Sequence, residues 1–125
     1  MSRGKVLFID AYDSFSNNII SLLRSQLPVS VESIHIDDSR FVFNDDAFYS
    51  YLQHFDAVVA GPGPGHPENA ADIGLIAKLW TAPDEHLLPV LGICLGFQSL
   101  CLAHGARVER LREPAWACDG GHALW

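Results

Sequence analysis

Short apolar runs, each followed by turn-forming residues, recur along the chain. Residues 6–9, 56–60 and 89–93 are almost continuously apolar, whereas residues 29–36 alternate apolar and polar side chains. Apolar runs of this length predict β-strands, and the continuous ones are typical of strands buried on both faces. The pattern therefore predicts four strands.

Between these runs, apolar residues return every three or four positions, which is the period of an amphipathic helix. We expect helices at about 15–27, 44–54, 68–80 and 95–104, with Pro28 ending the first and Gly105 stopping the last. Asp13 or Ser14 is expected to cap the first helix. Strands that alternate with helices predict an α/β fold, an open parallel sheet with helices on both faces.

Three unusual loops directly follow strands in this arrangement, at residues 10–15, 61–67 and 94–98. Right-handed crossovers place the loops after parallel strands on one edge of the sheet, where α/β proteins bind their ligands. The sequence therefore predicts a functional site that these three loops share.

Composition narrows the class of partner. The 125 residues carry 8 Lys and Arg against 15 Asp and Glu, a net charge of −7, which argues against nucleic acid and anionic membrane. The first apolar run is too short for a signal peptide or a membrane span, so we expect a soluble cytoplasmic protein. The three cysteines match neither a disulfide framework nor metal-ligand spacing, and we expect no metal and no cofactor.

The strongest local motif surrounds Cys94, which has Gly92 two residues before it and Gly96 two residues after it. Glycines in this pattern permit the tight strand-to-helix turn of a nucleophile elbow. The amino end of the following helix favours a thiolate at Cys94, and the amide of Leu95 is placed to donate to an oxyanion. The alternative is that Cys94 is a small buried hydrophobic residue, which is our interpretation of Cys101.

The second motif is the alternating Gly/Pro loop at 61–67. It lacks the Gly-Lys-Ser/Thr ending of a phosphate loop and the spacing of a dinucleotide fingerprint. Taken alone it reads as a turn. Beside Cys94 on the same sheet edge, its Gly63 amide becomes a candidate second oxyanion donor.

Three segments, at 8–15, 61–67 and 91–98, together resemble the class I (triad) glutamine amidotransferases, in particular the glutaminases of chorismate-using synthases. Their order and separation also match, over residues 5 to about 114. The resemblance implies a flavodoxin-like fold in which Cys94 is the nucleophile and Leu95 and Gly63 supply the oxyanion amides. It also implies that the substrate glutamine is held by Gly63, Pro64, Gly65 and Gln98, and that Ser14 lines the same pocket or the partner interface.

The resemblance is strongest to fungal aminodeoxychorismate synthases. It implies hydrolysis of glutamine to glutamate, with ammonia supplied to a chorismate-using synthase subunit or domain that makes 4-amino-4-deoxychorismate on the para-aminobenzoate (folate) pathway. Anthranilate synthase glutaminase shares all three motifs and remains an alternative. A non-catalytic module that binds glutamine or a synthase partner is also possible, as is a flavodoxin-like cysteine peptidase, although a peptidase elbow requires neither of the first two segments.

The resemblance fails at the end of the chain. The family supplies a His-x-Glu pair several tens of residues beyond the elbow, whereas this chain ends at Trp125. We expect residues 1–114 to be the N-terminal part of the amidotransferase domain and residues 115–125 to be an irregular tail. His66 and His122 are weak candidates for a replacement base, so we expect a chain that keeps the nucleophile, has lost turnover and is marginally stable.

Overall fold

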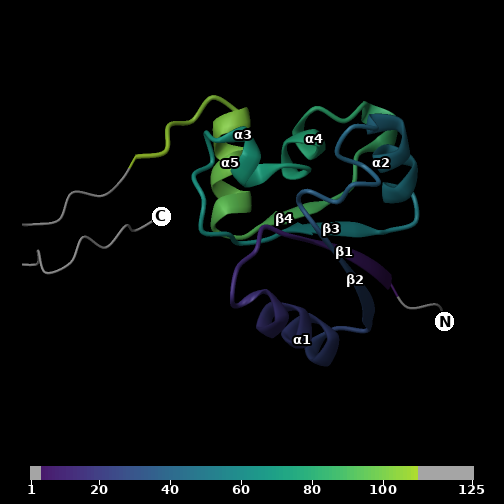
Figure 1. Ribbon diagram of the computed structural model, residues 1–125. Coiled ribbons are helices and arrows are strands. Elements are labelled where there is room, and N and C mark those ends of the chain that lie inside the picture. Colours follow the sequence, from purple (N-terminus) through teal and green to yellow (C-terminus); the bar gives the residue numbers. More distant parts are fainter. Residues whose placement is uncertain (1–3, 110–125) are drawn as a thin grey trace, which may run out of the picture.

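The computed structural model describes residues 4–109, which form a four-stranded parallel sheet with helices on both faces (Figure 1). The strands are β1 (Gly4–Asp10), β2 (Val29–His35), β3 (Ala57–Ala60) and β4 (Val90–Gly92). Their order in the sheet is β2-β1-β3-β4, and every neighbouring pair is parallel. The predicted fold class is confirmed.

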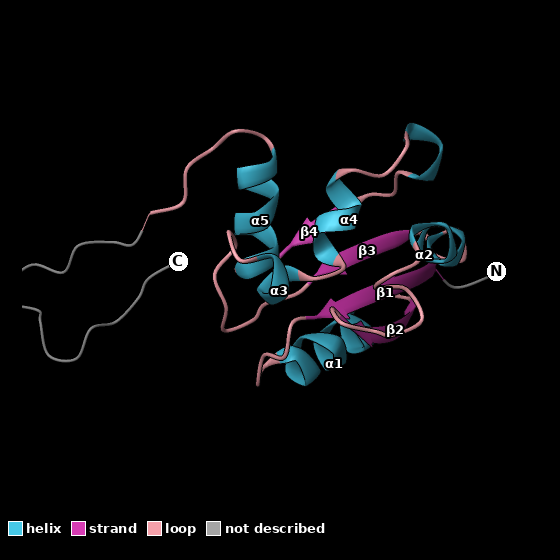
Figure 2. Ribbon diagram, turned by 45° about the horizontal axis from the view of Figure 1, so that its top comes forward, coloured by secondary structure: helices cyan, strands magenta, loops and turns pink. Residues whose placement is uncertain are grey.

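The two faces of the sheet are covered unequally. Of the helices described, α1 (Ser16–Gln26) is the one on one face, whereas α2 (Asp45–Leu52) and α5 (Leu95–Ala103) share the other face with two short helices, as Figures 1 and 2 show. Burial of apolar side chains is what drives these layers together. The smaller core under α1 contains Val6, Phe8, Ile20, Val31 and Val59. The larger core includes Leu7, Ile9, Phe48, Leu52, Ile76 and Leu95.

The single helix expected at 68–80 is wrong, because the structure divides it into α3 (Ala70–Ile73) and α4 (Ile76–Trp80). Gly74 between them has φ of +47°, a conformation that glycine adopts readily. A Cβ placed there would lie 2.3 Å from the carbonyl oxygen of Ile36, and Leu75 donates its N–H to that same oxygen at 2.9 Å. A contact with the end of β2 therefore interrupts the helix. A short 3₁₀ turn, η1 (Asp84–His86), follows α4.

The start of α1 also differs from expectation, because Phe15 occupies the cap position and makes no side-chain capping bond. Asp13 instead accepts the N–H of Phe15 at 2.7 Å, and Ser16 donates its hydroxyl to Asp10 at 2.8 Å. These acidic side chains fix the loop after β1 rather than cap the helix.

Strand register brings the predicted loops to one edge. Ile9 pairs with Ala60, and Ala60 pairs with Gly92. The chain therefore leaves β1, β3 and β4 at nearly the same height along the sheet edge. The chain runs outward from β1 to β2 and then returns to β3 on the other side of β1. The loops after β1 and β3 therefore flank the point where the strand order reverses, which is where ligands bind in open α/β sheets. Among residues 4–109, no helix has the length and apolar character needed to cross a bilayer.

Candidate functional site

Cys94 lies in the sharp turn between β4 and α5. Its backbone has φ of 50° and ψ of −107°, and it stands at the cap position of the helix with its side chain exposed. A residue other than glycine with positive φ is strained and persists only where its surroundings hold it. The alternative that Cys94 is a buried hydrophobic residue is therefore wrong. Cys101, two turns further along α5, is partly buried.

Contacts with neighbouring backbone require both glycines of the elbow. A Cβ at Gly92 would lie 2.8 Å from the backbone nitrogen of Phe97, and one at Gly96 would lie 2.1 Å from the carbonyl oxygen of Ala60. Real Cβ atoms do not approach backbone atoms so closely, because these distances lie well inside van der Waals contact. Gly96 thus allows the first turn of α5 to rest directly on the end of β3.

The Gly/Pro loop packs between the other two loops through Gly63. A Cβ at Gly63 would lie 2.6 Å from both Cβ and O of Ala11 and 2.9 Å from Cδ2 of Leu95. Gly63 therefore sits against the loop after β1 on one side and the first residue of α5 on the other. The Leu95 side chain is buried in the larger core, with 1% of its surface exposed. The three predicted loops do meet at one edge.

A cavity of about 480 Å³ opens beside Cys94. Cys94 and Gln98 are four residues apart and face it together from α5, and Gln98 is buried with 7% of its surface exposed. The segment that follows α5 also lines the cavity, and in it Arg107 and Glu109 form an ion pair of 3.1 Å. The residues lining the cavity are Cys94, Phe97, Gln98, Cys101, Ala106, Arg107, Val108 and Glu109.

The other predicted substrate contacts lie outside the lining of this cavity. Ser14 and Pro64 are exposed, and Gly63 and Gly65 are partly buried within their loop. The structure thus groups Cys94 with Gln98 and brings Gly63 into contact with Leu95. It places Ser14 further along the same edge, in the loop after β1.

Asp10 organises the loop after β1. Its Oδ1 accepts the N–H of Tyr12 at 2.8 Å, and its Oδ2 lies 3.6 Å from Nε2 of His35. Tyr12 has φ of 69° and stacks on His35, with ring centroids 4.5 Å apart. A hydrogen bond from the Tyr12 hydroxyl to Asp37 raises the pKa of that phenol above its ordinary value. These contacts hold the loop after β1 against the end of β2.

The sequence contains one His-x-Glu triplet, His66-Pro67-Glu68, and it lies before the elbow rather than beyond it. The backbone N–H of Glu68 donates to Nδ1 of His66 at 3.1 Å. His66 is partly buried within its loop. The other candidate base, His122, and the tail beginning at residue 115 lie outside the described residues.

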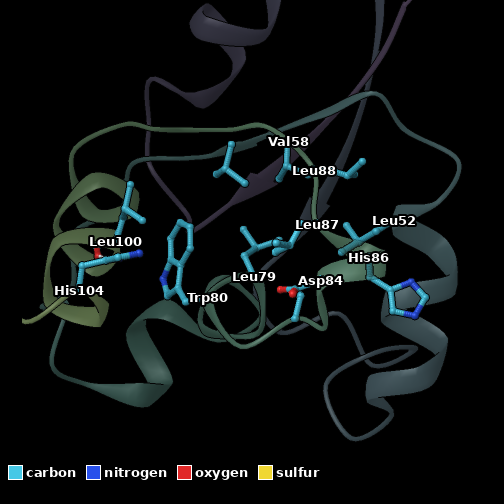
Figure 3. A pocket seen from close by; sticks show the side chains of 12 residues that line it. Leu52, Val58, Leu79, Trp80, Asp84, His86, Leu87, Leu88, Leu100 and His104 are labelled. Atoms are coloured by element: carbon cyan, nitrogen blue, oxygen red, sulfur yellow. Dashed lines mark hydrogen bonds between the residues drawn. The ribbon is translucent and has the colours of Figure 1, made fainter.

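A second cavity, of about 360 Å³, contains none of the predicted site residues. It lies among α2, α4, α5 and the segment before β4, and leucine is the commonest residue in its wall, as Figure 3 shows. Trp80 at its side donates Nε1–H to the Ser99 hydroxyl at 2.8 Å, which joins α4 to α5. In Figure 3 the His86 ring turns away from these leucines, and it stacks on Tyr49. Within residues 4–109 no cluster of His, Cys, Asp or Glu is suited to a metal ion.

Comparison with known proteins places this geometry in a family. The model of the family "Glutamine amidotransferase class-I" matches residues 7–118. Aminodeoxychorismate synthase of Saccharomyces cerevisiae is 44% identical over 117 residues, which cover 85% of this chain and 14% of that protein. Anthranilate synthase component II of Haloarcula marismortui is 33% identical over 114 residues, covering 88% of this chain and 48% of that protein.

A solved structure shares the fold. A Thermoplasma acidophilum protein described as part of a GMP synthase matches with a TM-score of 0.67 and 22% identity, over 91% of this chain and 51% of that one. The chain therefore spans about half the length of these shorter relatives and a seventh of the long synthase. The family match covers nearly the whole chain, and the chain belongs to the class I glutamine amidotransferases.

Proposed function

We propose that this chain carries the glutaminase site of a chorismate-using synthase, with Cys94 as its nucleophile. The observation that carries the proposal is the exposed Cys94 at positive φ, immediately before the first turn of α5. Strain at a single residue that its neighbours hold in place is characteristic of active sites. The contact between Gly63 and Leu95 supports the proposal, because it brings together the two loops that would supply oxyanion donors.

The reaction is hydrolysis of the glutamine side-chain amide through a thioester. The Cys94 thiolate attacks the carboxamide carbon, and the negative charge that develops on oxygen is stabilised by the amides of Leu95 and Gly63. As this intermediate collapses, the amide nitrogen takes a proton from water, the C–N bond breaks and neutral ammonia leaves. Water then adds to the thioester, freeing glutamate and the thiol.

Substrate contacts follow from the surroundings of the nucleophile. Gln98 is buried and faces the Cys94 cavity, so its amide is suited to hydrogen bonding with the substrate. We assign Gly63, Pro64 and Gly65 to the close backbone approach over the carboxamide. Ser14, exposed on the same edge, is assigned to the rim where the site meets the synthase partner.

Sequence identity favours aminodeoxychorismate as the product of the partner reaction. The aminodeoxychorismate synthases compared are 37% to 44% identical to this chain, whereas the anthranilate synthase components compared are 33% to 38% identical. Ammonia released at Cys94 would pass to chorismate bound by the synthase, and the alternative product is anthranilate.

Covalent labelling tests the nucleophile. A glutamine-like chloroketone, whose carbonyl takes the place of the carboxamide carbonyl, is expected to alkylate Cys94 with saturation kinetics and protection by glutamine, read out by mass spectrometry. Cys94→Ala should abolish labelling, whereas Cys101→Ala, which removes a partly buried thiol of the same cavity, should leave it intact. Non-saturating labelling that is equal at both cysteines would refute the proposal.

Glutamate release separates catalysis from binding. Hydrolysis that is lost in Cys94→Ala supports a glutaminase, and repeating the assay with an aminodeoxychorismate or an anthranilate synthase partner identifies the cognate reaction by the stimulation it gives. Saturable labelling without hydrolysis, alone or with either partner, assigns the chain to the glutamine-binding module instead.

A further inference from the structure

The Asp72 carboxylate holds the end of the Gly/Pro loop. Asp72, in the first turn of α3, accepts the backbone N–H of His66 through Oδ2 at 2.9 Å. Asn69, the cap residue of α3, donates its own N–H to the carbonyl of His66 at 3.0 Å. The end of the loop is thereby tied to the start of α3 through both polar groups of the His66 backbone.

Gly65 leaves room for this carboxylate because it has no side chain. A Cβ at Gly65 would lie 2.3 Å from Cγ and 2.6 Å from Oδ2 of Asp72. The space that a side chain at position 65 would fill is occupied by the Asp72 carboxyl group. Gly65 therefore admits Asp72 to the loop backbone.

The same loop contains Gly63, one of the two candidate oxyanion donors. Gly63, two residues before Gly65, packs against Ala11 and Leu95. Pro62 and Pro64 stiffen the backbone around it, because proline fixes φ. A loop that is stiff in its middle transmits a displacement at residues 65–66 to Gly63.

We propose that Asp72 is a positioning residue that fixes the 61–67 loop, so that the Gly63 amide is oriented toward the oxyanion before substrate arrives. This inference rests on the proposed glutaminase function. An electrostatic site of this kind works only when its donors are already in place, and the loss of one donor costs about 100- to 1,000-fold in rate. Asp72 acts on neither the nucleophile nor substrate directly, and its effect passes through the His66 amide.

The test compares Asp72→Ala with Asp72→Asn, which keeps an acceptor oxygen of the same size, and with Asp46→Ala, which removes an exposed carboxylate on α2. Asp72→Ala should lower the saturating rate of chloroketone labelling at Cys94 by about 10- to 100-fold, a partial loss of one oxyanion donor. Asp72→Asn should stay within about threefold and Asp46→Ala should match the parent chain, since the acceptor at His66 is kept. Alkylation by iodoacetamide, which needs no oxyanion donor, should change less than about twofold in all three.

Amide hydrogen exchange gives a second readout that does not require reactivity. Residues 61–67 should exchange faster in Asp72→Ala than in Asp72→Asn, with unchanged exchange in β1 and β3. Unchanged exchange in Asp72→Ala overturns the inference, as does an equal loss of chloroketone and iodoacetamide reactivity, which would indicate a disturbed elbow. A parent chain that the chloroketone does not label refutes the glutaminase proposal, and the exchange comparison then still decides whether Asp72 holds the loop.

Discussion

At the scale of single residues, the site depends on glycines, whose lack of a side chain allows close packing. Gly92, Gly96, Gly63 and Gly65 each lie where a Cβ would meet backbone or a packed side chain at under 3 Å. Because each of these glycines lacks a Cβ, a neighbouring segment can pack directly against its backbone. Together these four contacts let the three loops and the start of α5 meet. The strained backbone of Cys94 is tolerated because Gly92 and Gly96 let the chain around it pack tightly on both sides.

Gly96→Ala tests this packing. The new methyl group would meet the carbonyl oxygen of Ala60 at 2.1 Å, a backbone atom that cannot move aside, so we expect a loss of about 3 kcal/mol in the free energy of unfolding, the upper end for overpacking. Gly4→Ala is the control, because its nearest neighbour, Cγ1 of Val29, lies at 3.4 Å in ordinary contact. That change should be neutral or stabilising by up to about 1 kcal/mol. Urea unfolding followed by circular dichroism measures both, and equal effects would contradict the tight contact.

Sequence reasoning identifies residues whose chemistry is marked by local spacing. Cys94 is recognisable because two glycines flank it at fixed distances, and Gly63 because prolines alternate with glycines around it. Asp72 carries no such mark, since its partner is a backbone amide six residues earlier and any acidic residue in a first helical turn looks like helix capping. Only the folded loop shows where its carboxylate reaches.

At the scale of elements, pattern predicts the existence of strands and helices better than their ends. The apolar period across residues 68–80 persists through Gly74, because α3 and α4 bury their apolar sides in the same core. The break arises from a hydrogen bond between Leu75 and Ile36, two residues that are distant in sequence. A periodicity argument cannot detect such a bond.

Helix α2 offers a prediction in pH. Tyr51 packs against Phe41 and Phe55, with ring centroids 4.7 and 5.1 Å away. Burial, together with the nearby Glu32 carboxylate, raises the pKa of Tyr51 to about 12. The unfolded phenol loses its proton near pH 10, so between about pH 10 and 12 the unfolded chain binds fewer protons than the folded chain. Folding stability should therefore fall as pH rises through this window.

Tyr51→Phe should remove this pH dependence. The Tyr51 hydroxyl is buried and makes no hydrogen bond of ordinary geometry, although the Glu32 carboxylate lies close enough to raise its pKa, so at pH 7 the change should alter stability by less than about 1 kcal/mol. Tyrosinate absorbance during an alkaline titration should lose its highest step in the variant. If the step near pH 12 persists in Tyr51→Phe, it belongs to another group.

At the scale of the whole molecule, the two edges of the sheet differ in character. At the β2 edge, exposed polar side chains such as Glu32 and Ser33 discourage pairing with another strand. At the other edge, β4 pairs only with β3 within the described residues, and Leu91 on it is 57% exposed. Leu91 stands beside Val59 in the register, on the face that α1 covers only in part. The alternation of elements predicts the sheet, but it cannot tell which edge strand is left apolar, because that depends on strand order.

The apolar β4 edge, which has no further strand beside it within the described residues, predicts self-association of this chain. An unpaired, apolar strand edge is a template for another chain. Leu91→Glu should raise the dissociation constant by about tenfold or more, since burying a leucine contributes about 1.5–3 kcal/mol and about 1.4 kcal/mol is tenfold. Leu22→Glu on α1 is the matched control, because it makes the same charge change at a leucine that is 59% exposed. Sedimentation equilibrium over a range of concentrations distinguishes them: equal weakening would mean that added negative charge alone reduces association, and weakening by Leu91→Glu alone would locate the contact at β4.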